Sequence, residues 1–265
     1  MGCRLDNGLT LTARSGQRGM DRLSLTGLRV DCIVGVYPGE RNTPQPLGLD
    51  LVLHFDTRAA AYEAKLRDTV DYARLWGELR FLLQASRFLL LESAAEALAR
   101  YILAPPTEDA PRARVRAVSV RLSKPQALAG AGLPALEIER AADDFRLESE
   151  ARPFGQVDAI FATKGCGIQR LRIAPGRAIA AHEHRRMDES ELVLGYGLLL
   201  QGEAVAAGTA HRWPRGYVHR YDNPTSVEQS VLCVARPSFM PEDHIPANDS
   251  PATEREIEAT CFFRS

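Results

Sequence analysis

Apolar residues in the first part of the chain alternate with polar ones in two separate runs. The run from Leu23 to Val36 alternates loosely, and the run from Leu49 to Phe55 places an apolar residue at every second position. A period of two is typical of a strand that buries one face. The two runs therefore predict an antiparallel pair of strands joined by a long loop.

The period then changes to that of a helix. From Tyr72 onward leucines recur at helical spacing, and a second helical pattern runs from Glu92 to Ile102 before a Pro-Pro pair stops it. The run from Val115 to Leu122 alternates again, and a loop rich in Gly, Ala and Pro leads to a last strand from Ala135 to Glu139. This order predicts an α+β fold in which two helices accompany an antiparallel sheet.

The remainder of the chain lacks helical periodicity and consists of short apolar runs separated by Gly, Pro and Asp turns. These runs are Val157–Phe161, Leu171–Ile173, Leu192–Leu194, Leu198–Leu200 and Val231–Val234. Many short strands at close spacing are typical of an all-β sandwich or a small barrel. The sequence therefore predicts a second fold of a different class behind the first.

The domain boundaries follow from these patterns and from the length of 265 residues, which favours two domains. We expect residues 1–19 to be a disordered extension, or a stretch upstream of the true start, because Met20 stands directly before the first strand pattern. The first domain then covers residues 20–141, a charged linker residues 142–155, and the second domain residues 156–245. Residues 246–265 are expected to form a poorly ordered polar tail.

Composition restricts the classes of partner. With 45% hydrophobic and 25% charged residues and a net charge of −1, the chain has the composition of an ordinary globular protein. Nothing in its charge favours nucleic acid or an anionic membrane as a partner. No apolar run approaches the roughly 18 residues that cross a bilayer. Five scattered cysteines, an odd number, indicate a reducing compartment, so we expect a cytoplasmic protein.

Four polar residues of the first domain occupy special settings. Glu40 lies in a loop, Tyr72 begins a helix, Glu92 follows three leucines at a helix start, and Lys124 ends a strand. Each has an ordinary interpretation by itself. Glu92 suits a helix N-terminus, Lys124 suits the surface at a strand end, and Tyr72 suits the edge of a core.

Together these residues form an ordered set of motifs: GV-x-x-x-ER-x-x-x-Q from Gly35 to Gln45, DTVDY ending at Tyr72, LLE ending at Glu92, and KP at Lys124. The set resembles the dihydroneopterin aldolase family of the T-fold superfamily, over roughly residues 21–141. The resemblance implies a metal-independent retro-aldol cleavage of 7,8-dihydroneopterin. The products are 6-hydroxymethyl-7,8-dihydropterin and glycolaldehyde, in folate biosynthesis.

The resemblance also assigns roles. It implies that Lys124 moves the protons with Glu40 beside it, and that Tyr72 helps to protonate the enol-like intermediate. Glu92 is expected to accept paired hydrogen bonds from the pterin, as a carboxylate does from a planar pair of donors. Backbone groups around Val70, Asp71 and Leu91 complete the expected slot.

T-fold subunits of this kind close their sheets into a barrel as tetramers or octamers, with sites between subunits, so the resemblance implies a homo-oligomer. Two alternatives remain open. One is an epimerase of dihydroneopterin or its triphosphate. The other is a pterin-binding oligomer that does not cleave its ligand and serves as a scaffold for the second domain.

The second domain carries spaced metal-ligand residues. His182, His184 and Glu189 follow Gly176, and His219 follows a Pro-x-Gly turn, in a pattern that resembles the two motifs of the cupin superfamily over roughly residues 155–240. Histidines at i and i+2 on a strand point to one side, here into a barrel. The expected site therefore consists of His182, His184, Glu189 and His219.

Some choices at this site stay open. The glycine expected after Glu189 comes one position early, at Gly195, so Glu191 is an alternative to Glu189. Imidazole and carboxylate ligands suit Fe, Mn, Ni or Zn. His54, His211 and His244 fit no site and are treated as ordinary. The barrel is either an enzyme that acts on a pterin or on the released aldehyde, or a regulatory or oligomer-stabilising module without turnover.

Overall fold

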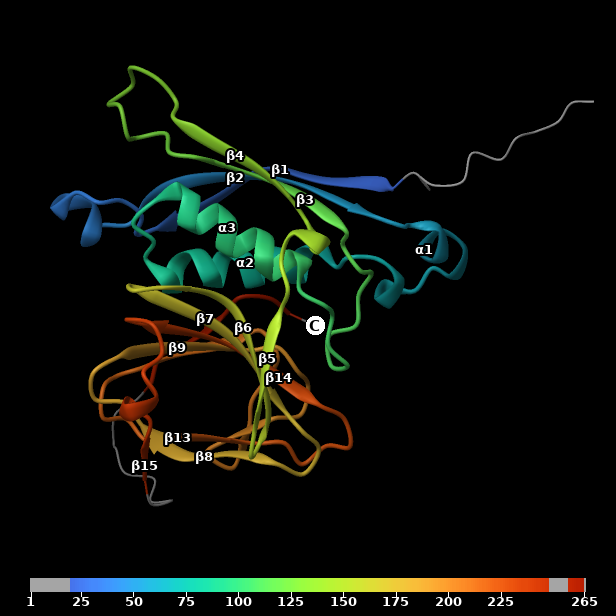
Figure 1. The fold of residues 1–265 in the computed structure, drawn as a ribbon, viewed down its shortest axis with the longest axis vertical. Helices are drawn as coiled ribbons and strands as arrows, with labels where there is room; N and C mark the ends of the chain where they lie inside the picture. The colour runs from blue at the N-terminus through green and yellow to red at the C-terminus, as the bar shows by residue number, and fades with distance from the viewer. Residues whose placement is uncertain (1–19, 248–256, 265) are drawn as a thin grey trace, which may run out of the picture.

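The computed structural model describes residues 20–247 and 257–264, so the expected extension 1–19 and part of the expected tail lie outside the described residues. The chain is arranged in three layers (Figure 1). An antiparallel sheet lies at one side, two helices lie in the middle, and an all-β barrel lies at the other side. We call residues 20–141 the first domain and the β-structure from residue 148 onward the barrel domain.

The sheet of the first domain has the strand order β1-β2-β3-β4. Its strands are β1 (Asp21–Cys32), β2 (Gln45–Phe55), β3 (Ala117–Ser123) and β4 (Ala135–Ala141), and all neighbouring pairs are antiparallel. One face of β2 is fully buried, from Leu47 to Phe55 at every second position. The predicted strand pair, the later strands and their α+β setting are confirmed.

Two helices cover the buried face of this sheet. They are α2 (Tyr72–Ser86) and α3 (Leu91–Leu103), as the helical periods predict. A short helix, α1 (Arg58–Glu63), precedes them and was not predicted. Buried residues of α3, including Leu98 and Ile102, share one hydrophobic core with the leucines of β2. None of the described helices is long and apolar enough to cross a membrane.

The barrel domain consists of two antiparallel sheets within the described part of the chain. The larger has the order β16-β12-β9-β14-β7-β6-β5, and the smaller has the order β11-β10-β13-β8-β15. The strands are β5 (Glu148–Arg152), β6 (Gly155–Thr163), β7 (Cys166–Ile173), β8 (Ala178–Glu183), β9 (Asp188–Val193), β10 (Leu199–Leu200), β11 (Glu203–Ala204), β12 (Thr209–Trp213), β13 (His219–Asp222), β14 (Gln229–Arg236), β15 (Ile245–Pro246) and β16 (Ala259–Cys261). The predicted all-β class of this half is therefore confirmed.

Two segments differ from the expected boundaries. Within the expected linker 142–155, β5 pairs with β6 and extends the larger sheet. In the expected tail, β16 pairs with β12, and Phe263 behind it is buried. The sequence predicted a linker over residues 142–155 because this segment is charged. It forms a strand all the same, because an edge strand with both faces exposed needs few apolar residues. The second strand escaped detection because its partner lies about fifty residues earlier in the chain.

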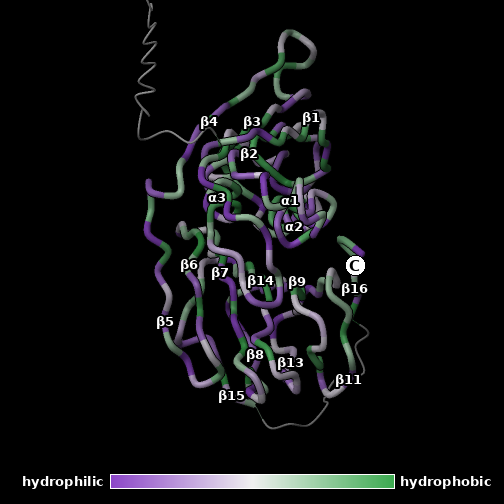
Figure 2. Tube along the Cα trace, turned by 90° about the vertical axis from the view of Figure 1, so that its right-hand side faces the viewer, coloured by the Kyte–Doolittle hydropathy of each residue, from purple (hydrophilic) through white to green (hydrophobic). Residues whose placement is uncertain are grey.

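The two domains share a packed interface (Figures 1 and 2). Leu79 of α2 and Leu232 of β14 belong to the same buried hydrophobic cluster. Hydrogen bonds also join the two domains. Asp109 of the first domain accepts from the backbone N–H and the hydroxyl of Ser230 in the barrel domain, at 2.6 and 2.9 Å. The helices are therefore covered by a sheet on both sides.

Two candidate functional sites

The first candidate site is built around an ion pair between Lys124 and Glu40. Lys124 follows β3, and its ammonium donates to a carboxylate oxygen of Glu40 in the loop between β1 and β2. The two side chains are 11% and 22% exposed. The hydrogen bond from Lys124 lowers the pKa of Glu40 against the opposing effect of burial, and the backbone N–H of Tyr37 adds to the lowering. The pair is therefore charge-balanced and largely shielded from water.

The loop that carries Glu40 is fixed by Gly35 and Arg41. Gly35 has φ +141°, and a Cβ at this position would lie 2.1 Å from a carboxylate oxygen of Glu40. Arg41 donates to the carbonyls of Gly35 and Phe88 at 3.1 Å and of Arg87 at 2.8 Å. Arg41 thus ties the Glu40 loop to the connection between α2 and α3.

That connection leads directly to Glu92. Glu92 lies exposed in the first turn of α3, directly after the half-buried Leu91. The structure therefore brings the loop of the Lys124–Glu40 pair against the segment that leads into Glu92. No hydrogen bond or ion pair joins Glu92 to Lys124 among the described residues.

The remaining residues of the expected pterin slot lie elsewhere in the protomer. Tyr72 is 60% exposed at the start of α2, and Asp71 caps this helix by accepting from the backbone N–H groups of Ala73 and Arg74. Helix α2 has 15 residues, and at 1.5 Å per residue its ends are about 21 Å apart. Because Arg41 contacts the far end of α2, one protomer does not bring Tyr72, Val70 and Asp71 to the Lys124–Glu40 pair.

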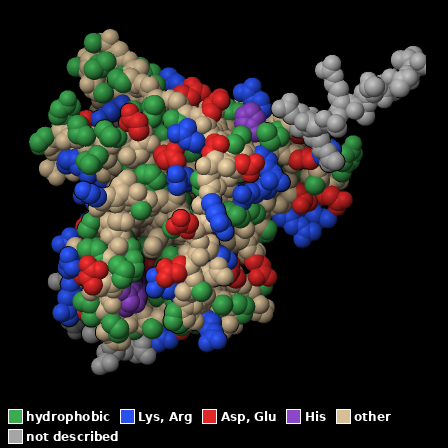
Figure 3. All heavy atoms as spheres, in the orientation of Figure 1, with side chains coloured by type: hydrophobic (Ala, Val, Ile, Leu, Met, Phe, Trp, Pro, Cys, Tyr) green, Lys and Arg blue, Asp and Glu red, His purple; other side chains and the backbone are tan. Residues whose placement is uncertain are grey.

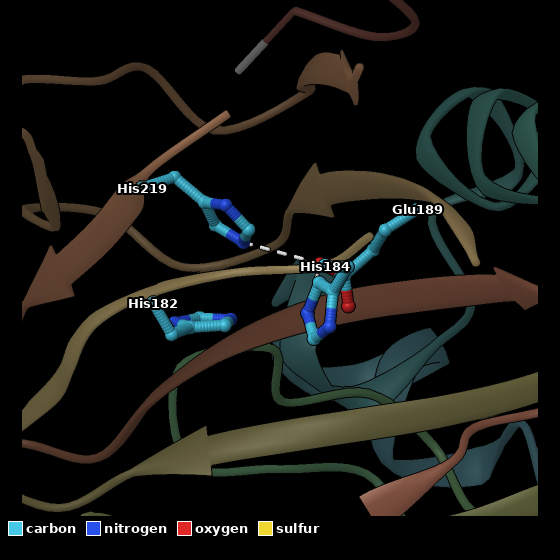
Figure 4. A group of neighbouring side chains, drawn as sticks. All are labelled: His182, His184, Glu189 and His219. Carbon is cyan, nitrogen blue, oxygen red and sulfur yellow. Dashed lines mark ion pairs between the residues drawn. The ribbon is translucent and has the colours of Figure 1, made fainter. Parts of the chain in front are cut away.

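The second candidate site lies inside the barrel (Figure 4). His182 lies at the end of β8 and His184 directly follows this strand, whereas Glu189 comes from β9 and His219 from β13. One ligand atom from each residue lies within 4.8 Å of the others. All four side chains are nearly inaccessible, so the expected metal-ligand residues do converge in a buried place.

The orientation of the imidazole rings suits a cation. The Nδ1 atoms of the three histidines lie near backbone carbonyls, at 2.8 Å for His182, 2.9 Å for His184 and 3.4 Å for His219. A ring that donates from Nδ1 presents its Nε2 lone pair to the centre. The buried Nε2 atoms of His184 and His219 have no hydrogen-bond partner among the described residues.

Glu189 rather than Glu191 occupies the carboxylate position. Its Oε2 lies 3.2 Å from Nε2 of His184 and 3.1 Å from Nε2 of His219, whereas Glu191 lies 3.9 Å from His219. Glu191 accepts a hydrogen bond of 2.6 Å from the indole N–H of Trp213. Burial and the neighbouring Glu189 raise the pKa of Glu191 to about 7. The residues thus fit a divalent ion held by three imidazoles and one carboxylate.

The two halves of the chain are similar to different known proteins. A family model described as dihydroneopterin aldolase matches residues 23–139. The dihydroneopterin aldolase of Escherichia coli K12 is 32% identical over 121 residues, which are 46% of this chain and 93% of that protein. The chain belongs to the dihydroneopterin aldolase family. The crystal structure of the E. coli aldolase with neopterin is 32% identical, covers 46% of this chain and 100% of that chain, and has a TM-score of 0.41.

The barrel domain lies outside the part matched to the aldolase family. It is similar to a variant of oxalate decarboxylase from Bacillus subtilis, at 16% identity, over 38% of this chain and 30% of that chain, with a TM-score of 0.33. Its two antiparallel sheets and the four converging side chains agree with the cupin resemblance of the sequence. This aldolase-family chain therefore carries a second, unrelated candidate site.

Sequence reasoning missed two neighbours of that site. The treatment of His244 as ordinary was wrong, because its ring stacks on His182 with centroids 4.2 Å apart. The carboxylate of Asp243 accepts from three successive backbone N–H groups, those of residues 185 to 187 between the ligands His184 and Glu189. Its carbonyl lies 2.9 Å from Nδ1 of His184. Asp243 and His244 lie more than fifty positions after His182, His184 and Glu189, and no spacing motif in the sequence indicates them.

The other two histidines that the sequence analysis treated as ordinary, His211 and His54, lie in different surroundings. His211 stacks on Trp213, whose ring in turn stacks on His219 at 4.5 Å, so His211 belongs to the surroundings of the barrel site. His54 lies on β2 in the first domain.

Proposed function

We propose that the first domain cleaves 7,8-dihydroneopterin by a retro-aldol reaction, to 6-hydroxymethyl-7,8-dihydropterin and glycolaldehyde. The observation that carries the proposal is the shielded pair of Lys124 and Glu40. Cleavage requires a group that removes a hydroxyl proton from the side chain of the substrate. In its free-amine form Lys124 can take that proton, and as the ammonium held by Glu40 it can return it.

The chemistry needs no metal in this proposal. The N5=C6 imine of dihydroneopterin accepts the electron pair of the breaking carbon–carbon bond once N5 is protonated. Lys124 then serves the proton transfers, and Glu92 binds the amino group and ring N–H of the pterin. Membership of a family in which a relative is solved with neopterin supports the substrate class.

We propose that the complete site forms between subunits of a homo-oligomer, a tetramer or an octamer. Tyr72 lies too far from Lys124 within one protomer to share its ligand, so a second copy must supply Tyr72. Exposed apolar side chains flank the Lys124–Glu40 pair, including Val36 and Tyr37 in one loop and Leu128 and Leu133 in the other. Figure 3 shows apolar side chains gathered at this end of the first domain.

The deciding experiment is product analysis after incubation of the full chain with 7,8-dihydroneopterin. The wild type and the control Lys164→Ala, an exposed lysine of the barrel domain, are expected to release glycolaldehyde, and Lys124→Ala is not. An epimerised substrate without glycolaldehyde would favour the epimerase. Bound but unchanged substrate would favour the non-cleaving scaffold.

We further propose that the barrel domain binds a divalent transition metal, one of Fe, Mn, Ni or Zn, through His182, His184, Glu189 and His219. Such an ion supplies Lewis acidity, or redox chemistry in the case of Fe or Mn, when bound. The buried Nε2 atoms of His184 and His219, which face Oε2 of Glu189 without a well-formed hydrogen bond, support this proposal. Metal analysis of purified protein should give about one ion per chain, lost in His219→Ala and retained in His54→Ala.

A further inference from the structure

A cavity of about 300 Å³ opens beside the proposed metal ligands in the barrel. His182, His184 and Glu189 form one side of it. The wall away from these residues is mostly apolar, with Phe154, Val157, Leu171, Ile179 and Phe239 as its main side chains. The cavity therefore has a polar end and an apolar body.

Few polar groups line the apolar body of this cavity. Among the described lining residues, Arg152 and Gln169 are the polar side chains away from the ligand cluster and its neighbours. The guanidinium of Arg152 already donates to Glu150 at 2.8 Å. A bound molecule thus meets hydrocarbon over most of its surface.

The end of the cavity that carries the proposed metal ligands favours an anionic group instead of hydrocarbon. Three neutral imidazoles and one carboxylate leave a divalent cation with a net positive charge in a buried place. Burying such a charge is unfavourable unless an anionic partner accompanies it. An oxygen anion on the ligand satisfies this requirement, and the apolar wall then receives the rest of the molecule.

We infer that the barrel binds a small carboxylate or enolate with an apolar, preferably aromatic, body, and that the pterin product of the aldolase is not its ligand. This inference rests on the proposed metal site. A pterin presents an amino group, a ring N–H and a carbonyl at one edge, and a buried edge needs matching partners. Of the two carboxylates that line the cavity, Glu189 is a proposed metal ligand and Glu191 already accepts a hydrogen bond from Trp213. The two domains therefore act on different molecules.

The test uses the full chain loaded with Mn²⁺ and three probes: benzoate, acetate and 6-hydroxymethylpterin. Calorimetry measures the affinity of each probe. Only binding that is absent from His219→Ala is counted as binding in the barrel, because the first domain is itself proposed to bind pterins. Fluorescence gives a second readout, because Trp213 stacks on His219 and the chain has two tryptophans, of which Trp76→Phe removes the other. We expect benzoate to bind at least about tenfold more tightly than acetate, because its ring buries apolar surface, and the pterin to bind no better than acetate.

A matched pair of variants tests whether the apolar lining of the cavity contributes to benzoate binding. Leu171→Asn is expected to weaken benzoate binding by roughly tenfold while leaving Mn²⁺ uptake unchanged, which also reports that the barrel is folded. Leu66→Asn, at an exposed leucine of the first domain, should change neither. Equal affinities for benzoate and acetate, a preference for the pterin, or benzoate binding without metal would each overturn the inference alone. Failure to take up any metal would overturn the proposed metal site together with it.

Discussion

The ammonium of Lys124 and the carboxylate of Glu40 form an ion pair although 84 positions separate them in the chain. The pair joins the end of β3 to the loop that follows β1, and Arg41 in turn holds this loop against the connection between α2 and α3. Two separate motifs are thus linked by an ion pair on one end of the first domain, and the third follows the connection that Arg41 contacts. This linkage makes the role of each residue separately testable.

Glu40→Gln should reduce the rate of cleavage by about 10- to 100-fold, less than the roughly 10²- to 10⁴-fold loss expected for Lys124→Ala. The amide keeps an acceptor for the lysine but removes the charge that the ammonium faces. Steady-state kinetics with 7,8-dihydroneopterin checks this order. Glu63→Gln, which breaks the exposed pair with Lys65, is the control and should behave as the wild type. A Glu40→Gln rate equal to that of the wild type would remove Glu40 from the mechanism.

Arg41→Lys should raise the KM for the pterin by about tenfold with a smaller effect on kcat, because a lysine cannot replace three hydrogen bonds to carbonyls from a planar group. The Glu40 loop and the Glu92 helix would then no longer be held in one geometry. Kinetics and thermal unfolding measure the two effects separately. Arg58→Lys, at an exposed ion pair with Asp56, should leave both unchanged. A loss of stability with normal KM would mean that Arg41 is purely structural.

Asp243→Ala should weaken metal binding by about 10- to 100-fold, as expected for the loss of a group that orients ligands. Its carboxylate holds the backbone between His184 and Glu189, so without it both ligands lose their fixed separation. Calorimetric titration with Zn²⁺ gives the affinity. The neighbouring Glu242→Gln, an exposed residue, serves as the control. Unchanged affinity in Asp243→Ala would show that the segment is held without this carboxylate.

A pH-dependent contribution to stability is expected at Asp158 of β6. Burial raises its pKa, but the hydrogen bonds from Ser149, Arg172 and Arg170 and the charge of Arg170 together act more strongly, and the net pKa lies below the ordinary 3.8. A lowered folded-state pKa contributes stability that is complete above about pH 4 and is lost as the pH falls through the folded value.

Asp158→Asn should therefore lower the free energy of unfolding by about 3–5 kcal/mol at pH 7, because it leaves the buried Arg170 without its charge partner. The difference from the wild type should shrink towards pH 3. Urea unfolding at both pH values measures it, with Glu150→Gln at an exposed pair as the control. A difference that stays the same at both pH values would contradict this assignment.

Much of the fold follows from local sequence. The alternation from Leu49 to Phe55 and the helical spacing after Tyr72 depend on backbone periods alone, so they predict β2 and α2 without knowledge of the partners. The two histidines at i and i+2 also face one side for that reason. Dihydroneopterin aldolase membership rests on such ordered local motifs.

Contacts between distant segments were decided by tertiary structure. Only packing brings Asp243 and His244 to the barrel site, pairs β16 with β12, and covers α2 and α3 with a second sheet. It also separates Tyr72 from Lys124 by about the length of a helix, which is why the proposed pterin site needs a second subunit. The physical reason is that the hydrophobic period along the chain determines on which face of a helix or strand a residue lies. The partner of that face is chosen by burial across the whole molecule.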